Sequence, residues 1–153
     1  MSISFSVHEK VSGETAVVFG EYSHLIGICT RPERSTQADV NDASQGFAVV
    51  MVTAGMLPSS GPFRLHMSLA QSLSAEGIAS LRFDLSGIGE SLAVGGGGSS
   101  LERAAKEISA AIDYLHEELG IERVALFGLC SGADDALYAA LQDHRIMGVF
   151  SID

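Results

Sequence analysis

Residues 127–133 read Phe-Gly-Leu-Cys-Ser-Gly-Ala, and this is the most informative segment of the sequence. An apolar run precedes it and a helical segment follows it, so it predicts a sharp turn from a strand into a helix. In such a turn, the side chains two positions before and two positions after the tip must be very small. Gly128 and Gly132 meet this requirement around Cys130, whereas a register centred on Ser131 would put a leucine in the crowded position. The spacing therefore predicts Cys130 at the tip.

The predicted turn suits nucleophilic chemistry by a thiol. The following helix begins at Ser131 and directs its positive end towards Cys130, which favours the thiolate. The backbone N–H of Ser131 is then placed to stabilise an oxyanion. The alternative is a buried cysteine in a Gly-rich turn without chemistry. The flanking glycines favour the sharp turn with Cys130 at its tip, whereas catalysis by this chain alone is less favoured.

Outward from this turn, apolar runs and helical segments alternate along the chain. This alternation predicts an α/β fold, with a mostly parallel sheet covered by helices on both faces. Ser99 followed by Glu102 is a capping box that begins one of the helices. We expect a single domain over 1–153 with an N-terminal extension at 1–14. The expected strands are 16–19 and 25–29 as a hairpin, then 47–53, 78–85, 124–129 and 147–152, and the expected helices are 65–77, 99–120 and 133–141.

Composition and charge exclude several classes of function. The formal net charge is −10 and the nine Lys and Arg residues are scattered, so a nucleic-acid partner would be repelled. The two cysteines form no paired motif, which argues against a disulfide framework or a zinc site and favours a reducing cytoplasm. We expect no metal or other cofactor. The start of the chain is not a signal peptide, and no apolar run approaches the ~20 residues of a membrane span, so no membrane partner is expected.

Three segments in order carry a resemblance to a known family. They are Gly-Pro-Phe-Arg at 61–64, Leu-Arg-Phe-Asp-Leu-Ser-Gly-Ile-Gly-Glu-Ser at 81–91, and the turn around Cys130. Together they resemble the α/β-hydrolase superfamily, with most similarity to serine-aminopeptidase-like and exosortase-system-associated hydrolases. The resemblance covers about 15–153 and implies only the N-terminal half of such a fold, truncated after about its sixth strand.

The resemblance also implies roles for residues near the turn. The N–H of Met56, or less favourably of Leu57, is the candidate second oxyanion donor. Relatives often carry His-Gly where Ala-Gly stands at 54–55, which leaves the identity of this donor open. Asp84 is implied to be structural, accepting hydrogen bonds from turn amides.

In the family the acid and the histidine follow the nucleophile along the chain. Asp153 is the candidate acid because it ends the strand expected beside the turn, although a plain turn residue is the favoured alternative. His144 is expected at the base of the sheet, away from Cys130. Arg64 and His66 are interpreted as helix-surface residues near the mouth of the site. The remaining histidines, all interpreted as surface residues, are His8, His24 and His116.

These observations predict an acyl hydrolase or acyltransferase that acts on a small-molecule ester or thioester with Cys130 as nucleophile. The chain offers no evident catalytic histidine, so the alternative is a non-catalytic binding or assembly module, or a truncated fragment. A dinucleotide-binding domain is disfavoured because the turn lacks the third glycine of that motif. The apolar strand at 149–152 would lie at a sheet edge, which predicts a homo-oligomer or a complementary C-terminal half.

Overall fold

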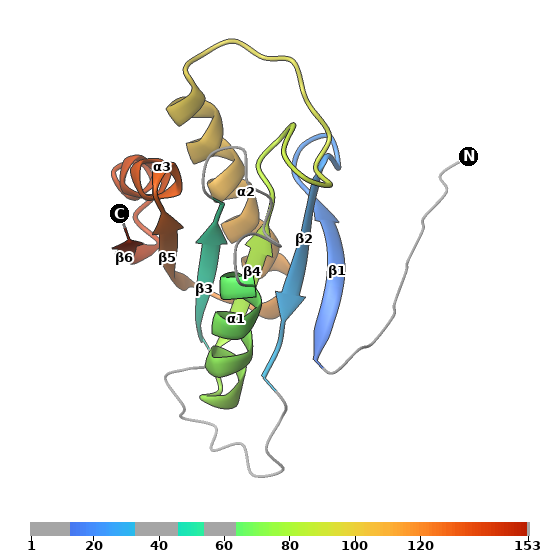
Figure 1. Ribbon diagram of the computed structural model, residues 1–153, viewed down its shortest axis with the longest axis vertical. Coiled ribbons are helices and arrows are strands. Elements are labelled where there is room, and N and C mark those ends of the chain that lie inside the picture. The colour runs from blue at the N-terminus through green and yellow to red at the C-terminus, as the bar shows by residue number, and fades with distance from the viewer. Residues whose placement is uncertain (1–12, 33–45, 54–63, 153) are drawn as a thin grey trace, which may run out of the picture.

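The alternating segments form one six-stranded sheet with the strand order β1-β2-β4-β3-β5-β6 (Figure 1). The computed structural model describes residues 13–32, 46–53 and 64–152. Strands β1 and β2 form an antiparallel hairpin, β2 pairs antiparallel with β4, and the other neighbours are parallel. The predicted mostly parallel α/β sheet is therefore confirmed. The strands are β1 (Glu14–Phe19), β2 (Leu25–Thr30), β3 (Phe47–Val52), β4 (Ala79–Phe83), β5 (Arg123–Leu129) and β6 (Ile146–Ile152).

Helices cover both faces of this sheet. Helix α1 packs on one face, where Ala70 joins Val49, Met51 and Phe127 in a small apolar cluster. Helices α2 and α3 pack on the other face and, with strand residues of alternating parity, form the larger core. The result is three layers, with α1 in front of β4 in Figure 1. The helices are α1 (Leu65–Ala75), α2 (Ser100–Leu119) and α3 (Ser131–Ala140).

The ends of α2 follow the sequence signals closely. The Ser99 hydroxyl accepts a hydrogen bond from the Glu102 N–H at 3.2 Å, and the Glu102 carboxylate accepts one from the Ser99 N–H at 2.7 Å. The predicted capping box is therefore confirmed. Gly120 ends the helix in the left-handed conformation, with φ of 69°.

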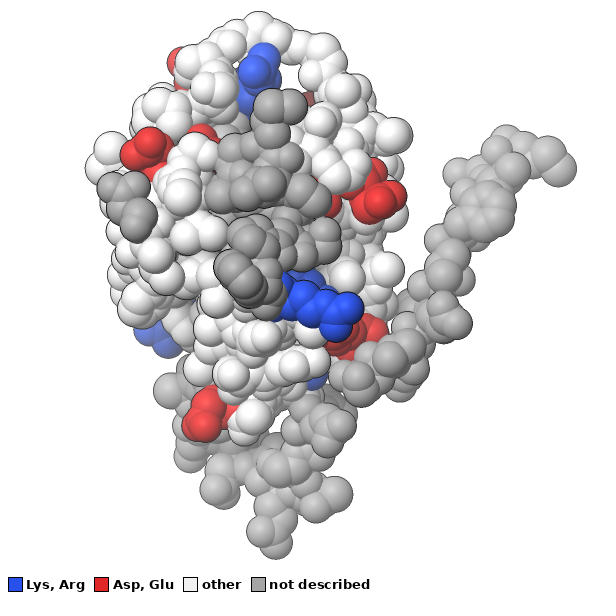
Figure 2. Space-filling view, in the orientation of Figure 1, with Lys and Arg blue, Asp and Glu red and all other residues white. Residues whose placement is uncertain are grey.

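The chain is acidic overall, with a formal net charge of −10. On the face shown in Figure 2, acidic and basic side chains are scattered and do not gather in one patch. No helix in the described ranges is long and apolar enough to cross a membrane. The predicted surface loop at 33–44 lies outside the described residues.

Candidate active site

Three neighbouring parallel strands end at the same edge of the sheet. Strand β3 lies between β4 and β5 in the strand order, and all three run in one direction. The residues that directly follow their carboxyl ends are Thr53, Asp84 and Cys130. In open α/β sheets, ligand sites gather at this edge.

The backbone of Cys130 has an unusual conformation, with φ of 50° and ψ of −122°. A positive φ is uncommon for a residue with a side chain and costs of order 1–3 kcal/mol. Cys130 is exposed and lies directly between the end of β5 and the start of α3. The turn therefore presents the thiol at its tip, where the spacing of the glycines predicts it.

Two glycines leave no room for any side chain beside this tip. A Cβ atom at Gly128 would overlap the Gly132 carbonyl oxygen and lie 2.7 Å from the Cα of Ala133. A Cβ atom at Gly132 would lie 2.5 Å from the carbonyl oxygen of Thr53 and 2.9 Å from that of Val52. Both overlaps are with backbone, which cannot rotate away as the end of a flexible side chain can. This crowding gives the physical reason for a register centred on Cys130.

Backbone hydrogen bonds hold the strained residue from both sides. The Cys130 N–H donates to the Ile152 carbonyl at 2.8 Å, which ties the turn to the neighbouring strand β6. The Ala133 N–H donates to the Cys130 carbonyl at 2.8 Å, which closes the first turn of α3. The nucleophile candidate is thus fixed by two elements, as a preorganised site requires.

The N-terminus of α3 begins at the candidate nucleophile. Cys130 is the residue before the first helical position, and the exposed Ser131 occupies that position. First-turn N–H groups of a helix lack intrahelical partners and carry a partial positive charge. The assignment of Ser131 as an oxyanion donor stays a prediction. Met56 and Asp153, the candidate second donor and the candidate acid, lie outside the described residues.

Asp84 organises the loop that follows β4. It is buried, and its carboxylate accepts a hydrogen bond from the Glu90 N–H at 3.3 Å. Its carbonyl accepts a hydrogen bond from the Ser91 hydroxyl at 2.6 Å, and the same hydroxyl oxygen accepts one from the Ile26 N–H at 2.9 Å. This network ties the loop to the hairpin and uses Asp84 as an acceptor for a turn amide.

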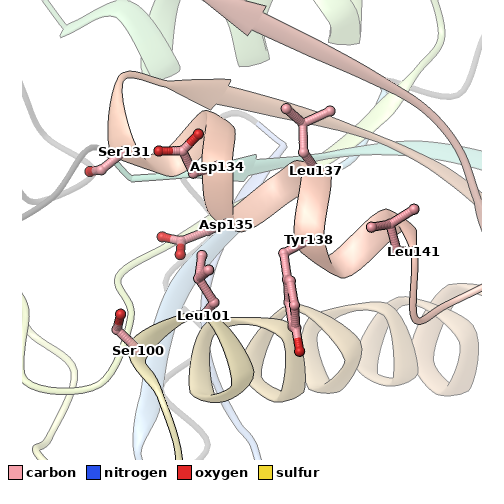
Figure 3. A pocket seen from close by; sticks show the side chains of 8 residues that line it. All are labelled: Ser100, Leu101, Ser131, Asp134, Asp135, Leu137, Tyr138 and Leu141. Atoms are coloured by element: carbon pink, nitrogen blue, oxygen red, sulfur yellow. The ribbon is translucent and has the colours of Figure 1, made fainter.

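A pocket of about 540 Å³ opens between the start of α2 and the length of α3, and Ser131 is part of its wall (Figure 3). Asp134 and Asp135 also line it. Burial, then the charges of Asp134 and Glu107, raise the pKa of Asp135 to about 6. The pocket therefore places a carboxyl group that titrates near neutral pH on the same helix as the candidate oxyanion donor.

His66 differs from the expectation of a helix-surface residue. Its side chain is buried between α1 and the sheet, and its ring meets that of Phe127 edge-on at 5.8 Å with an interplanar angle of 87°. Burial lowers the pKa of His66, as does Arg82, while Asp84 acts in the opposite direction. The interpretation was wrong because the helical period does not show which polar residue in the first turn faces the sheet. Arg64, by contrast, is exposed.

The other described histidines have separate environments. His24 is buried, which contradicts its assignment to the surface, and its ring lies 5.9 Å from that of Tyr22. His116 is exposed at the end of α2. His144 is exposed in the turn before β6, so it lies at the amino ends of the parallel strands, whereas Cys130 lies at their carboxyl ends. Within the described part of the chain, no group of three or more His, Cys, Asp or Glu side chains could hold a metal ion.

Solved structures share the fold of this chain. A hypothetical protein from Pseudomonas aeruginosa superimposes with a TM-score of 0.74 at 20% identity, over 99% of this chain and 48% of that one. An α/β serine hydrolase without a lid from Xanthomonas campestris gives a TM-score of 0.67 at 18% identity, over 93% of this chain and 62% of that one. The chain has the α/β-hydrolase fold. A cold-adapted esterase from an Arctic intertidal metagenomic library shares this hydrolase fold, with a TM-score of 0.66 at 19% identity, over 99% of this chain and 65% of that one.

The chain spans about half to two thirds of the length of these three structures. No family model and no curated protein matches the sequence. The predicted α/β-hydrolase fold is confirmed by the structural neighbours.

Proposed function

We propose that this chain is the nucleophile-bearing part of an acyl hydrolase, in which Cys130 attacks a small-molecule ester or thioester. The observation that carries the proposal is the positive φ of Cys130. Cys130 lies at the tip of a turn in which positions 128 and 132 have no room for a side chain. Strained backbone of this kind persists where surrounding contacts over-determine it, and it clusters at active sites. Esterases and serine hydrolases among the structural neighbours support the same class of reaction.

The proposed reaction has two steps. The Cys130 sulfur attacks the acyl carbon, the bond to the alcohol or thiol breaks, and the leaving group takes the proton of the thiol. Water then attacks the resulting thioester, which releases the carboxylic acid and restores the thiol. An alcohol or amine in place of water would make the second step an acyl transfer. A thiol reacts best with activated acyl groups, which favours esters and thioesters over peptides.

The second candidate function is a non-catalytic binding or assembly module with a hydrolase fold. It is favoured by the environments of the described histidines, none of which has a contact with Cys130. A triad needs such a base to take and return protons. This candidate predicts that the thiol has no special reactivity towards acyl groups.

The test is release of p-nitrophenol from short-chain p-nitrophenyl esters by the wild type, Cys130→Ser and Cys130→Ala. We expect at least one equivalent of rapid release from the wild type, because the thiol acylates even without a base. The serine variant should lose this burst, since a hydroxyl needs a base to become a nucleophile. Cys130→Ala measures the background. Equal traces from all three proteins would reject the hydrolase proposal in favour of the binding module.

A further inference from the structure

Two buried polar side chains near the candidate nucleophile have no hydrogen-bond partner in the part of the chain that the structure describes. Both ring nitrogens of His66 are unpaired, and the residue is 7% exposed. The hydroxyl of Thr53, which directly follows β3, is also unpaired, and this residue is 1% exposed. Burial of an unpaired polar group is costly, so such groups point to a catalytic role or to a bound polar molecule.

The imidazole of His66 lies over the carboxyl-terminal part of β3. On one side, the charges of Arg82 and Asp84, at the end of β4, act on its pKa. On the other side, its ring meets that of Phe127 on β5, with 5.8 Å between the ring centroids. Strand β3 lies between β4 and β5, and its residue Met51 pairs with both Arg82 and Phe127. The imidazole therefore spans β3 at the level of Met51 or beyond it.

Thr53 shares this face of the sheet. Val49 and Met51 belong to the apolar cluster under α1, and side chains alternate along a strand, so that of Thr53 also faces α1. Helix α1 runs from the carboxyl edge to the amino edge, because it connects the end of β3 to the start of β4. Helix side chains lean towards the N-terminus, so the imidazole of His66, in the first turn, leans towards the carboxyl edge. The two unpaired groups therefore lie together at this edge.

Cys130 follows the neighbouring strand at the same level. Val52 pairs with Gly128, so Thr53 is one residue short of the level of Cys130. A spacing of about 4.8 Å between strands and about 3.3 Å per residue puts the Cα atoms of Thr53 and Cys130 roughly 6 Å apart. The close approach of Gly132 to the Thr53 carbonyl agrees with this placement. A single water molecule can therefore bridge the unpaired groups and an acyl group on the thiol.

The charges around His66 suit a group that accepts a proton. Burial, then the charge of Arg82, lower the pKa of His66, so the ring is neutral near pH 7. Asp84 acts in the opposite direction and favours the imidazolium that forms when the ring takes a proton. Arg82 pairs with Glu14 at 3.1 Å, which offsets part of its charge, and Arg64 on α1 is exposed. A neutral imidazole with an unpaired nitrogen is able to act as a general base.

We propose that His66 is a further catalytic residue and that, with the hydroxyl of Thr53, it binds the water that attacks the acyl group on Cys130. This role rests on the proposed hydrolase and belongs to its second step. The water oxygen bonds to the acyl carbon while the imidazole takes one proton of that water. The carbon–sulfur bond then breaks, the carboxylic acid leaves, and the imidazolium returns its proton to the sulfur through a water molecule. Protons balance over the step, and water is the only other reactant.

The lifetime of the acyl-enzyme tests this role. Each protein is acetylated with p-nitrophenyl acetate and freed of ester, and mass spectrometry with peptide mapping follows the acetyl group on Cys130. His66→Gln should acetylate as the wild type does but lose the acetyl group roughly a hundredfold more slowly, because an amide binds water and cannot take its proton. His24→Gln is the matched control and should behave as the wild type, since His24 is 8% exposed with an unpaired Nδ1 but lies in the turn before β2.

A second pair of variants tests the hydroxyl without touching the imidazole. Thr53→Val keeps the shape of the side chain and should slow loss of the acetyl group roughly tenfold, because the water loses one hydrogen bond. Thr30→Val is its control, since the Thr30 hydroxyl is also unpaired at 2% exposure. Thr30 pairs with Ser80 near the start of β4, at the amino edge of the parallel strands, so its variant should deacetylate at the wild-type rate. Circular dichroism confirms that each variant is folded.

The pH dependence separates a base from a residue that only supports the fold. Loss of the acetyl group from the wild type should slow as the pH falls through the lowered pKa of His66, below its ordinary value of about 6.5, because the protonated ring cannot accept a proton. His66→Gln should show no such step. Equal acetyl lifetimes in the wild type and His66→Gln overturn this role while the hydrolase stands. A wild type that never acquires an acetyl group on Cys130 rejects the hydrolase, and the role of His66 with it.

Discussion

Cys130 is held in its strained conformation by its neighbours. Gly132 allows the start of α3 to touch the carbonyl of Thr53 at the end of β3, and Gly128 lets the same helix close over β5. Both contacts are backbone against backbone, so they position the thiol without any side chain. The nucleophile can therefore be replaced without loss of the turn, whereas the glycines cannot.

Gly132→Ala is expected to lower the free energy of unfolding by about 2–3 kcal/mol, because its Cβ would overlap backbone that must move. Gly46→Ala is the matched control, since a Cβ there meets nothing within 4 Å. Urea unfolding followed by circular dichroism measures both variants. Similar stabilities for the two would show that the turn has room that the geometry does not indicate.

The buried imidazole of His66 makes stability depend on pH. Its pKa is lowered, so the folded state resists protonation that the unfolded chain accepts. Stability is then complete above the ordinary pKa of about 6.5 and falls as the pH drops below it. His66→Phe keeps a ring against Phe127 and cannot titrate.

We therefore expect the wild type to lose stability relative to His66→Phe between pH 7 and pH 5, measured by thermal unfolding at each pH. Asp135, with its pKa raised to about 6, contributes in the opposite direction, so the two proteins are compared at the same pH. His116→Gln, at an exposed position, is the control and should follow the wild type. Parallel curves for the wild type and His66→Phe would contradict this account.

At the scale of elements, strand β6 depends on the turn before it. Arg145 links this turn to α2 and holds the pKa of Asp143 down to about 2 by hydrogen bonds, against the effect of burial. A carboxylate with a lowered pKa stabilises the fold above its ordinary pKa of about 3.9, and this contribution is lost as the pH falls through about 2.

Asp143→Asn should lower the free energy of unfolding by about 1–2 kcal/mol at pH 7, and this difference from the wild type should vanish near pH 2. Asp113→Asn is the control, because Asp113 also pairs with Arg145 but its side chain is 56% exposed. An exposed pair contributes about 0–1 kcal/mol. A larger effect from Asp113→Asn would place the main support of the turn on α2 instead.

The elements that the sequence predicts best are those with local signals. The capping box at Ser99, the stop at Gly120 and the glycines around Cys130 act over a few residues, and each was found at its predicted place. The burial of His66 and His24 depends on which face of an element meets the sheet, and that choice is made by packing between distant segments. The tie from Cys130 to Ile152 needs the strand order, which the resemblance to the hydrolase family implied and no local pattern contains.

At the scale of the whole molecule, the net charge opposes folding. The chain carries a formal net charge of −10, so its charges repel one another more strongly in the folded state than in the expanded unfolded chain. Salt screens the repulsion, with a Debye length that falls from about 30 Å at 0.01 M to about 10 Å at 0.1 M, and it leaves apolar contacts in place. The free energy of unfolding should therefore be higher at the higher salt concentration.

Urea unfolding at the two salt concentrations, followed by circular dichroism, measures this effect. A stability that falls as salt is added would show that the ion pairs of the folded state outweigh the repulsion.

The hydrogen bond from the Cys130 N–H to the Ile152 carbonyl joins the attacking residue to the edge strand. An amide exchanges its hydrogen with solvent only when such a bond opens, so the exchange rate at Cys130 records how often the end of β6 separates from β5. Whatever comes to lie against β6 will slow that opening. The exchange rate of the Cys130 amide therefore reports whether strand β6 is covered, and deuterium uptake measures it in the absence of any substrate.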